Sequence, residues 1–145
     1  MNEVNVGLEA VLNSYYEYLG CKKCSLYHNR SNNDILSGFG SASADIMVIT
    51  DAPSMEDYNR QALLSDEHGR LFMNMLEMVW YDEDAEMDKI RDLYGESYFD
   101  ALRDYLSKHI FFAPVVACPI EDKRKVADDQ AKACKERVFD LIYAV

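Results

Sequence analysis

The chain has 145 residues, of which 49% are hydrophobic and 12% aromatic, and its formal net charge is −11. This composition predicts one compact domain over residues 1–145 and excludes a chain that is disordered throughout. The acidic charge argues against a simple nucleic-acid-binding protein, because duplex-binding surfaces are basic. No apolar run approaches the roughly 20 residues that span a membrane, and the first residues lack a signal-peptide pattern. We therefore expect a cytoplasmic protein without a membrane partner.

The first part of the chain contains one predicted helix and one predicted strand. Apolar residues recur at helical spacing over residues 6–19, and Gly20 suits the end of that helix. Residues 25–44 are rich in Ser, Asn and Gly, and they predict a long ordered loop. The continuous apolar run 46–50 is typical of a buried parallel strand. Residues 51–54 end this strand, and a polar stretch follows them.

The second part contains further helical segments and a second strand. Apolar spacing predicts a helix over residues 71–79 and more helix over residues 87–106, with an interruption near Gly95. Residues 110–116 read as a second buried strand. Pro114 within this strand indicates an edge or a bulge, because proline cannot donate a ladder hydrogen bond.

A last helix completes the predicted fold. Asp128 or Asp129 is expected to cap it, and apolar residues follow at helical spacing to Val145. The order of elements is typical of a three-layer α/β/α fold with a short parallel sheet. Two strands make a thin sheet and the chain stops inside an apolar helix. We therefore expect an α/β fold that is incomplete at the C-terminus, either part of a larger fold or completed by a partner.

The four cysteines are candidate metal ligands: Cys21, Cys24, Cys118 and Cys134. Two residues separate Cys21 from Cys24 on a turn after the first helix, so both sulfurs can point to one centre. Four thiolates suit a tetrahedral zinc site or an iron–sulfur cluster, and the spacing does not choose between them. The alternatives are four buried free thiols or two disulfides, and a cytosolic context disfavours disulfides. We expect one shared metal site.

The motifs around the cysteines form a specific combination. They are Cys21-x2-Cys24-Ser25-Leu26, Arg30, Gly38-x-Gly40, Ala44–Val48 and Asp51-Ala52-Pro53, with Cys134 sixteen positions after Cys118. This combination resembles family-4 uracil-DNA glycosylases over about residues 8–142. Those enzymes begin with Cys-x-x-Cys-x-Leu, an Arg and Gly-x-Gly, and continue into a strand that ends in Gly-Glu-Ala-Pro-Gly.

The resemblance implies a cofactor and a fold. In that family the four cysteines hold a structural [4Fe–4S] cluster, and here zinc is the less expected occupant of the same residues. The cluster would connect the first helix, the second strand and the last helix in a uracil-DNA-glycosylase-like fold. Such a connection suits a small domain because it supplements a modest apolar core.

The resemblance also assigns a catalytic group and a base pocket. Asp51 stands where the family has its Glu and is the candidate catalytic carboxylate; the alternative is an Asp that caps a turn. The base pocket would comprise Ala52, Pro53, Leu64 and Pro114. Leu64 replaces a Phe that stacks on uracil, and it offers no π-face. Pro114 replaces an Asn that reads the uracil edge, and it has neither a side-chain donor nor an acceptor.

The family's second motif, a His-Pro-Ser-like loop that supplies the leaving-group His, is absent from this chain. The three histidines are His28, His68 and His109, and none of them precedes a proline. Each is expected on the surface or in a loop rather than in a catalytic role.

Two kinds of partner surface follow from the sequence. Candidate DNA contacts lie in two loops that must be close together if the cysteines converge, with ordinary surface cations as the alternative. They are Lys22, Lys23, Arg30, Lys123, Arg124 and Lys125. A protein partner is expected at the exposed sheet edge or on the C-terminal helix around Val138, Leu141 and Val145.

These observations favour a divergent, catalytically degenerate glycosylase-like protein that serves as a DNA-associated or protein-binding component of replication or repair. The first alternative is an active uracil-DNA glycosylase with Asp51 as its main catalytic group. The second is an acidic interaction protein that does not bind DNA, because nine acidic residues lie within residues 82–104. Such acidic runs more commonly form a solvated helical face.

Overall fold

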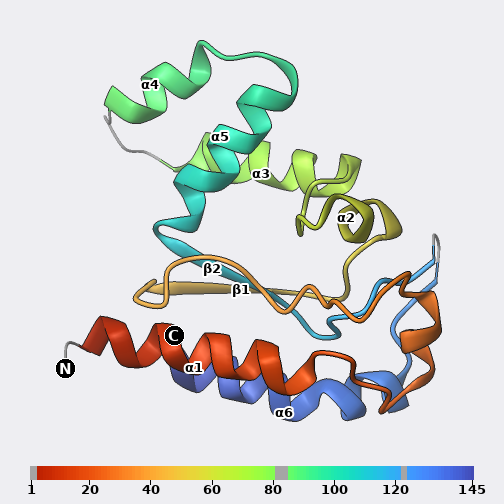
Figure 1. Ribbon diagram of the computed structural model, residues 1–145. Helices are drawn as coiled ribbons and strands as arrows, with labels where there is room; N and C mark the ends of the chain where they lie inside the picture. Colours follow the sequence, from red (N-terminus) through yellow and green to blue (C-terminus); the bar gives the residue numbers. More distant parts are fainter. Residues whose placement is uncertain (1–2, 81–84, 122–123) are drawn as a thin grey trace.

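The computed structural model describes residues 3–80, 85–121 and 124–145, with side chains described from residue 7 onward. The fold is α/β, with a two-stranded parallel sheet and helices on both of its faces (Figure 1). The elements are α1 (Glu3–Tyr18), a 3-10 helix (Ser25–Asn29), β1 (Ile46–Thr50), α2 (Met55–Arg60), α3 (Glu67–Val79), α4 (Ala85–Arg91), α5 (Gly95–Ser107), β2 (Ile110–Pro114) and α6 (Asp128–Ala144). No helix in these ranges is long and apolar enough to cross a membrane.

The two strands differ in burial. They pair in parallel register from Ile46 opposite Ile110 to Thr50 opposite Pro114. Every residue of β2 is buried, because Phe39 bridges to Phe112 on the edge of β2 that faces away from β1. In β1, by contrast, Ile46 and Ile49 are almost half exposed. Among the described residues, no strand pairs with the outer edge of β1.

The alternation of side chains along β2 divides the core between two layers. Phe111 and Ala113 pack with Leu141 on the side of the sheet where α1 and α6 run next to each other (Figure 1). Ile110 and Phe112 face the opposite side, where they pack against α3, α4 and α5 in the larger core cluster. This division follows from the two-residue period of a strand, in which successive side chains point to opposite faces.

Several predicted elements are confirmed. The strand expected at residues 46–50 is β1, with the same bounds. The first helix ends at Tyr18, and Gly20 adopts a left-handed φ of 71° while its N–H donates to the carbonyl of Asn33 at 3.0 Å. Glycine suits this position because it has no Cβ to clash in that conformation. Helix α5 begins at Gly95, where the sequence predicts an interruption.

Other local expectations were wrong or incomplete. The polar stretch after Ser54 contains helix α2, whose first turn is held by a capping box between Ser54 and Asp57. The last helix is capped at Ala127, whose N–H donates to the side chain of Gln130 at 2.9 Å. The two acids expected to cap this helix, Asp128 and Asp129, lie in its first turn instead. Negative charges favour that position because they face the positive end of the helix dipole.

Pro114 lies at the last position of β2 and creates no bulge, since the register with β1 runs unbroken to Thr50. The next residue continues the ladder, because the N–H of Val115 donates to the carbonyl of Thr50 at 2.7 Å. A proline at the end of a strand therefore removes no hydrogen bond within the strand.

Candidate metal centre and the pocket beside β1

The four cysteines, which come from three distant parts of the chain, line one pocket. Cys21 and Cys24 follow α1, Cys118 follows β2, and Cys134 lies on α6. The apolar wall of this pocket includes Ile35 and Ala117, and Tyr18 closes its α1 side. The contact between α1 and α6 brings these segments together beneath the sheet (Figure 1).

The cysteine pocket is narrow, and besides the four sulfurs its polar side chains are those of Tyr18, Lys23 and Tyr27. Its free volume is about 10 Å³, and none of the four cysteines forms a disulfide. No carboxylate or imidazole lines it. Among the described residues, no group of three or more His, Cys, Asp or Glu side chains is arranged to hold a metal ion. The fit to a metal therefore rests on donor chemistry, since four thiols are the ligand set of structural zinc and of iron–sulfur clusters.

The electrostatics of this pocket are dominated by burial. Burial raises the pKa of the Cys118 thiol to about 11, although the nearby charge of Arg30 opposes the rise. Burial likewise raises the pKa of the Cys24 thiol, against a hydrogen bond from the backbone of Leu26. The backbone N–H of Lys23 donates to the sulfur of Cys21 at 3.4 Å. A metal would have to displace protons from these thiols, because the thiolate is the ligand.

The two loops that carry the basic residues are in contact. The side-chain amide of Asn29 donates to the carbonyl of Pro119 at 2.9 Å, and Gln130 donates to the hydroxyl of Ser25 at 3.3 Å. Arg30 is bonded within the first of these loops. Its guanidinium donates to the carbonyl of Cys21 at 2.6 Å and to that of Asn33 at 3.1 Å.

The other candidate DNA contacts that the structure describes are exposed. The ammonium groups of Lys22 and Lys23 lie over the rings of Tyr27 and Tyr18, at 6.0 and 4.5 Å from the ring centroids. Arg124 pairs with Glu121 at 2.9 Å, and Lys125 is exposed. Lys123 lies outside the described residues. A shared basic patch made of these residues stays a prediction.

A second pocket lies where β1 ends, and its volume is about 690 Å³. The candidate catalytic residue Asp51 lines it, together with two of the four predicted base-pocket residues, Ala52 and Leu64. The other two, Pro53 and Pro114, are buried and are not among its lining residues. The pocket is positioned by the strand ends, as is usual for binding sites of open α/β sheets.

The turn before α3 forms part of the wall of this pocket, and the buried carboxylate of Asp57 holds that turn in place. Asp57 is 3% exposed and accepts hydrogen bonds from the N–H groups of Ser54, Ser65 and Asp66, and from the hydroxyl of Ser65. This network holds the turn in which Leu64 takes a left-handed φ of 61°. A leucine in that conformation is strained. The turn packs directly on Gly69, since a Cβ there would lie 2.4 Å from the backbone of Leu64.

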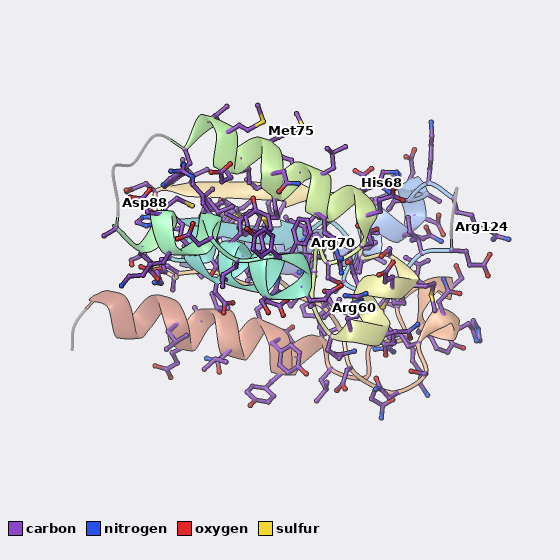
Figure 2. The ribbon with its side chains drawn as sticks, turned by 90° about the horizontal axis from the view of Figure 1, so that it is seen from above. Arg60, His68, Arg70, Met75, Asp88 and Arg124 are labelled. Atoms are coloured by element: carbon purple, nitrogen blue, oxygen red, sulfur yellow. The ribbon has the colours of Figure 1, made fainter. Side chains whose placement is uncertain are left out.

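The pocket beside β1 is acidic at its rim. Asp51, Asp66 and Glu121 line it, and its cationic side chain Arg124 is already paired with Glu121. His68 also lines the pocket, from the first turn of α3, and Figure 2 shows it on the same side of the molecule as Arg124. Sequence reasoning placed His68 on the surface. It is exposed, but its place in this pocket could not be inferred without the turn before α3.

Part of the acidic segment is neutralised by ion pairs. Glu96 bonds to Arg70 at 2.8 Å and to Arg60 at 3.1 Å, and Figure 2 shows both arginines in the region of α2 and α3. Lys108 pairs with Glu86 at 2.6 Å. These pairs connect helices to one another, which fits a solvated helical face. Three more acids of the segment lie outside the described residues: Asp82, Glu83 and Asp84.

The comparisons with known proteins assign no family to this chain. No protein-family model matches the sequence, and a search of curated proteins finds no match.

Proposed function

We propose that this chain is a divergent uracil-DNA-glycosylase-like [4Fe–4S] protein, catalytically degenerate, that serves as a DNA-associated or protein-binding component of replication or repair. One observation carries the proposal: the four cysteines of the family-like motif, far apart in sequence, line one pocket. Cys21, Cys24, Cys118 and Cys134 would hold the cluster. Its role would be structural, because it would join α1, the segment after β2 and α6 into one unit.

The pocket beside β1 supports a loss of catalysis. Uracil excision requires a flipped base to be stacked and read along its Watson–Crick edge. Leu64 provides an apolar wall without an aromatic face, and Pro114 is buried away from the pocket. The acids at the rim would also repel the phosphates that flank a flipped nucleotide. Neither base reading nor phosphate binding is therefore favoured here.

Two surfaces support a role in binding proteins. The outer edge of β1 has no strand partner among the described residues and exposes Ile46 and Ile49. On α6 the partner surface expected around Val138, Leu141 and Val145 was wrong, because Val138 and Leu141 are buried and Val145 packs against the core cluster that contains Leu141. The exposed apolar side chains of its C-terminal half are instead Phe139, Ile142 and Tyr143, with Tyr143 89% exposed. Unpaired strand edges and grouped apolar side chains are common interaction surfaces.

The first experiment measures the cofactor. Protein purified without oxygen should contain iron and inorganic sulfide in equal amounts and absorb visible light as iron–sulfur proteins do. Cys24→Ser should lose this absorbance, whereas Ser25→Ala, which alters the neighbouring exposed residue, should keep it. A colourless protein that contains zinc would retain the cysteine site but contradict the iron assignment. Protein without any metal would overturn the proposal.

Glycosylase activity is the second candidate, because Asp51 and His68 line the same pocket. A uracil-containing oligonucleotide is incubated with cluster-loaded protein and then treated with alkali, which cuts the strand at any excised base. The proposal predicts no cleavage. Cleavage that Asp51→Ala abolishes would establish the active enzyme.

DNA binding is measured separately, by titrating the same oligonucleotide at several salt concentrations. A DNA-associated protein binds it at low ionic strength, whereas an acidic interaction protein does not bind it even there.

A further inference from the structure

Arg137, on α6, is a fully buried charged side chain with 0% exposure. Its Nη1 donates to the carbonyl of Ser37 at 2.7 Å and to the Ser37 hydroxyl at 3.1 Å. Its Nη2 donates to the carbonyls of Pro114 and Val115, the latter at 3.1 Å. The Nε of Arg137 is buried and has no hydrogen-bond partner among the described residues. The side chain is thus held by neutral groups alone.

The charge of Arg137 lacks a carboxylate partner. Within the described ranges, the ion pairs join other side chains and none includes Arg137. Burying a cation is costly unless an opposite charge compensates it, because the protein interior screens and solvates charge poorly. Burial lowers the pKa of Arg137, and the neighbouring Cys134 opposes this shift.

The groups near Arg137 that can become negative are mainly thiols. Cys134 lies one helical turn before Arg137 on the same face of α6, and Cys118 is also within electrostatic range. Arg30 acts on Cys118 from the loop after α1, and its Nε is likewise buried without a partner. Two guanidinium groups with unused donors therefore flank the pocket that the four cysteines line.

We propose that Arg137, assisted by Arg30, is the internal counter-charge of the cysteine site. The inference rests on the proposed metal centre. Four thiolates around a zinc ion or an oxidised [4Fe–4S] core leave about two negative charges uncompensated. The buried guanidinium of Arg137 and the half-buried one of Arg30 match this charge. In return, the thiolates provide the anion that the burial of Arg137 requires.

The same side chain connects the cysteine site to the pocket beside β1. The carbonyls that bind Arg137 belong to Pro114 and Val115, at the end of β2. Directly after them, the N–H groups of Val115 and Val116 donate to the carbonyls of Thr50 and Asp51 at 2.7 and 3.1 Å. Arg137 is therefore a positioning residue for the strand ends as well as a counter-charge. Metal bound by the cysteines would stabilise the backbone that carries Asp51.

The test compares Arg137→Gln, which removes the charge, with Arg137→Lys, which keeps it. Lys132→Gln, on the exposed surface of the same helix, is the control. Metal-loaded protein is challenged with a chelator, and the midpoint potential of the cluster is measured. Loss of supporting groups around metal ligands typically weakens binding about 10- to 100-fold. Arg137→Gln should release iron faster by about that factor and should have a more negative potential. Arg137→Lys should keep most of the wild-type behaviour.

Arg30→Gln is measured in the same way, so that a result is obtained even if Arg137→Gln does not fold. This variant should also shift the potential to more negative values, because it removes the second cation near Cys118. If wild-type protein holds metal and the charge-removing variants match it in release rate and potential, the counter-charge role is wrong and the proposed cofactor stands. If wild-type protein holds no metal, both are overturned.

Discussion

The cysteine pocket and the pocket beside β1 are formed next to the same two strand ends, but their surroundings are opposite in character. The first is narrow, with about 10 Å³ of free volume, and four thiols line it, with the guanidinium groups of Arg30 and Arg137 nearby. The second is wider, at about 690 Å³, and carries acids at its rim. A narrow site of thiols near cationic groups is what the proposed structural cluster requires. Acids at a pocket rim repel the phosphates that flank a nucleotide, and this repulsion supports the proposed loss of catalysis.

The largest expected effect comes from removing one cysteine, and the contrasting change removes one residue of the pocket beside β1. Cys134→Ser should lower the free energy of unfolding of metal-loaded protein by more than about 4 kcal/mol, because loss of a structural metal is among the largest single-residue effects. Asp51→Ala should change it by less than about 0.5 kcal/mol, since Asp51 is exposed. Urea denaturation followed by circular dichroism measures both values. Lys135→Ser, an exposed site next to Cys134, should behave like Asp51→Ala.

The pocket beside β1 can be disrupted without touching the cysteines. Asp57→Ala leaves the N–H groups of Ser54, Ser65 and Asp66 without their buried acceptor, and should cost about 3 kcal/mol. Ser65→Ala removes one hydroxyl donor from the same carboxylate and should cost about 1 kcal/mol. Metal content should be unchanged in both variants. Loss of metal in Asp57→Ala would show that the cysteine site depends on the turn before α3 as well as on the strand end that Arg137 holds.

A smaller effect tests the tight turn before α3. Gly69→Ala places a Cβ 2.4 Å from the backbone of Leu64, so the strained turn must move. The expected loss is about 1–3 kcal/mol, the usual cost of overpacking. His68→Ala, at the exposed neighbouring position, should be nearly neutral. Equal stability of the two variants in a thermal melt would mean that the turn is loose rather than fixed.

The smallest expected effect concerns the ion pairs of the acidic segment. Hydrogen bonding to Arg70 lowers the pKa of the Glu96 carboxyl below its usual value of 4.5, and Arg60 adds to this effect. A carboxyl with a lowered pKa stabilises the fold above its unfolded pKa, and this contribution disappears as the pH falls through its folded pKa. Glu96→Gln should therefore be slightly less stable than wild type at pH 7, and equally stable in strong acid. Melting temperatures across this pH range measure the difference.

The sequence predicted the elements that have strong local signals. β1 is a run of five apolar or β-branched residues between Asp45 and Asp51, and its bounds were predicted correctly. Helix α2 was missed because its six residues have no apolar period. The capping pattern of Ser54 and Asp57 is the signal that could have revealed it.

The candidate site was predictable only in part. The cysteine spacing led to the expectation of one shared site, and all four cysteines do line one pocket. The burial of Arg137 was not foreseen, because an arginine in a polar helix reads as a surface residue until the packing of α6 is known. The resemblance placed Leu64 in the pocket and it does line it, but the left-handed φ of 61° that Leu64 adopts there was not predicted.

The proposed cofactor requires Cys21, Cys24, Cys118 and Cys134 to hold one cluster together. Native mass spectrometry of anaerobically purified protein measures whether they do. We expect an intact mass that exceeds that of the bare chain by one [4Fe–4S] unit, with all four thiols protected from alkylation until the iron is removed. An intact mass equal to that of the bare chain, with the four thiols free to react, would contradict it.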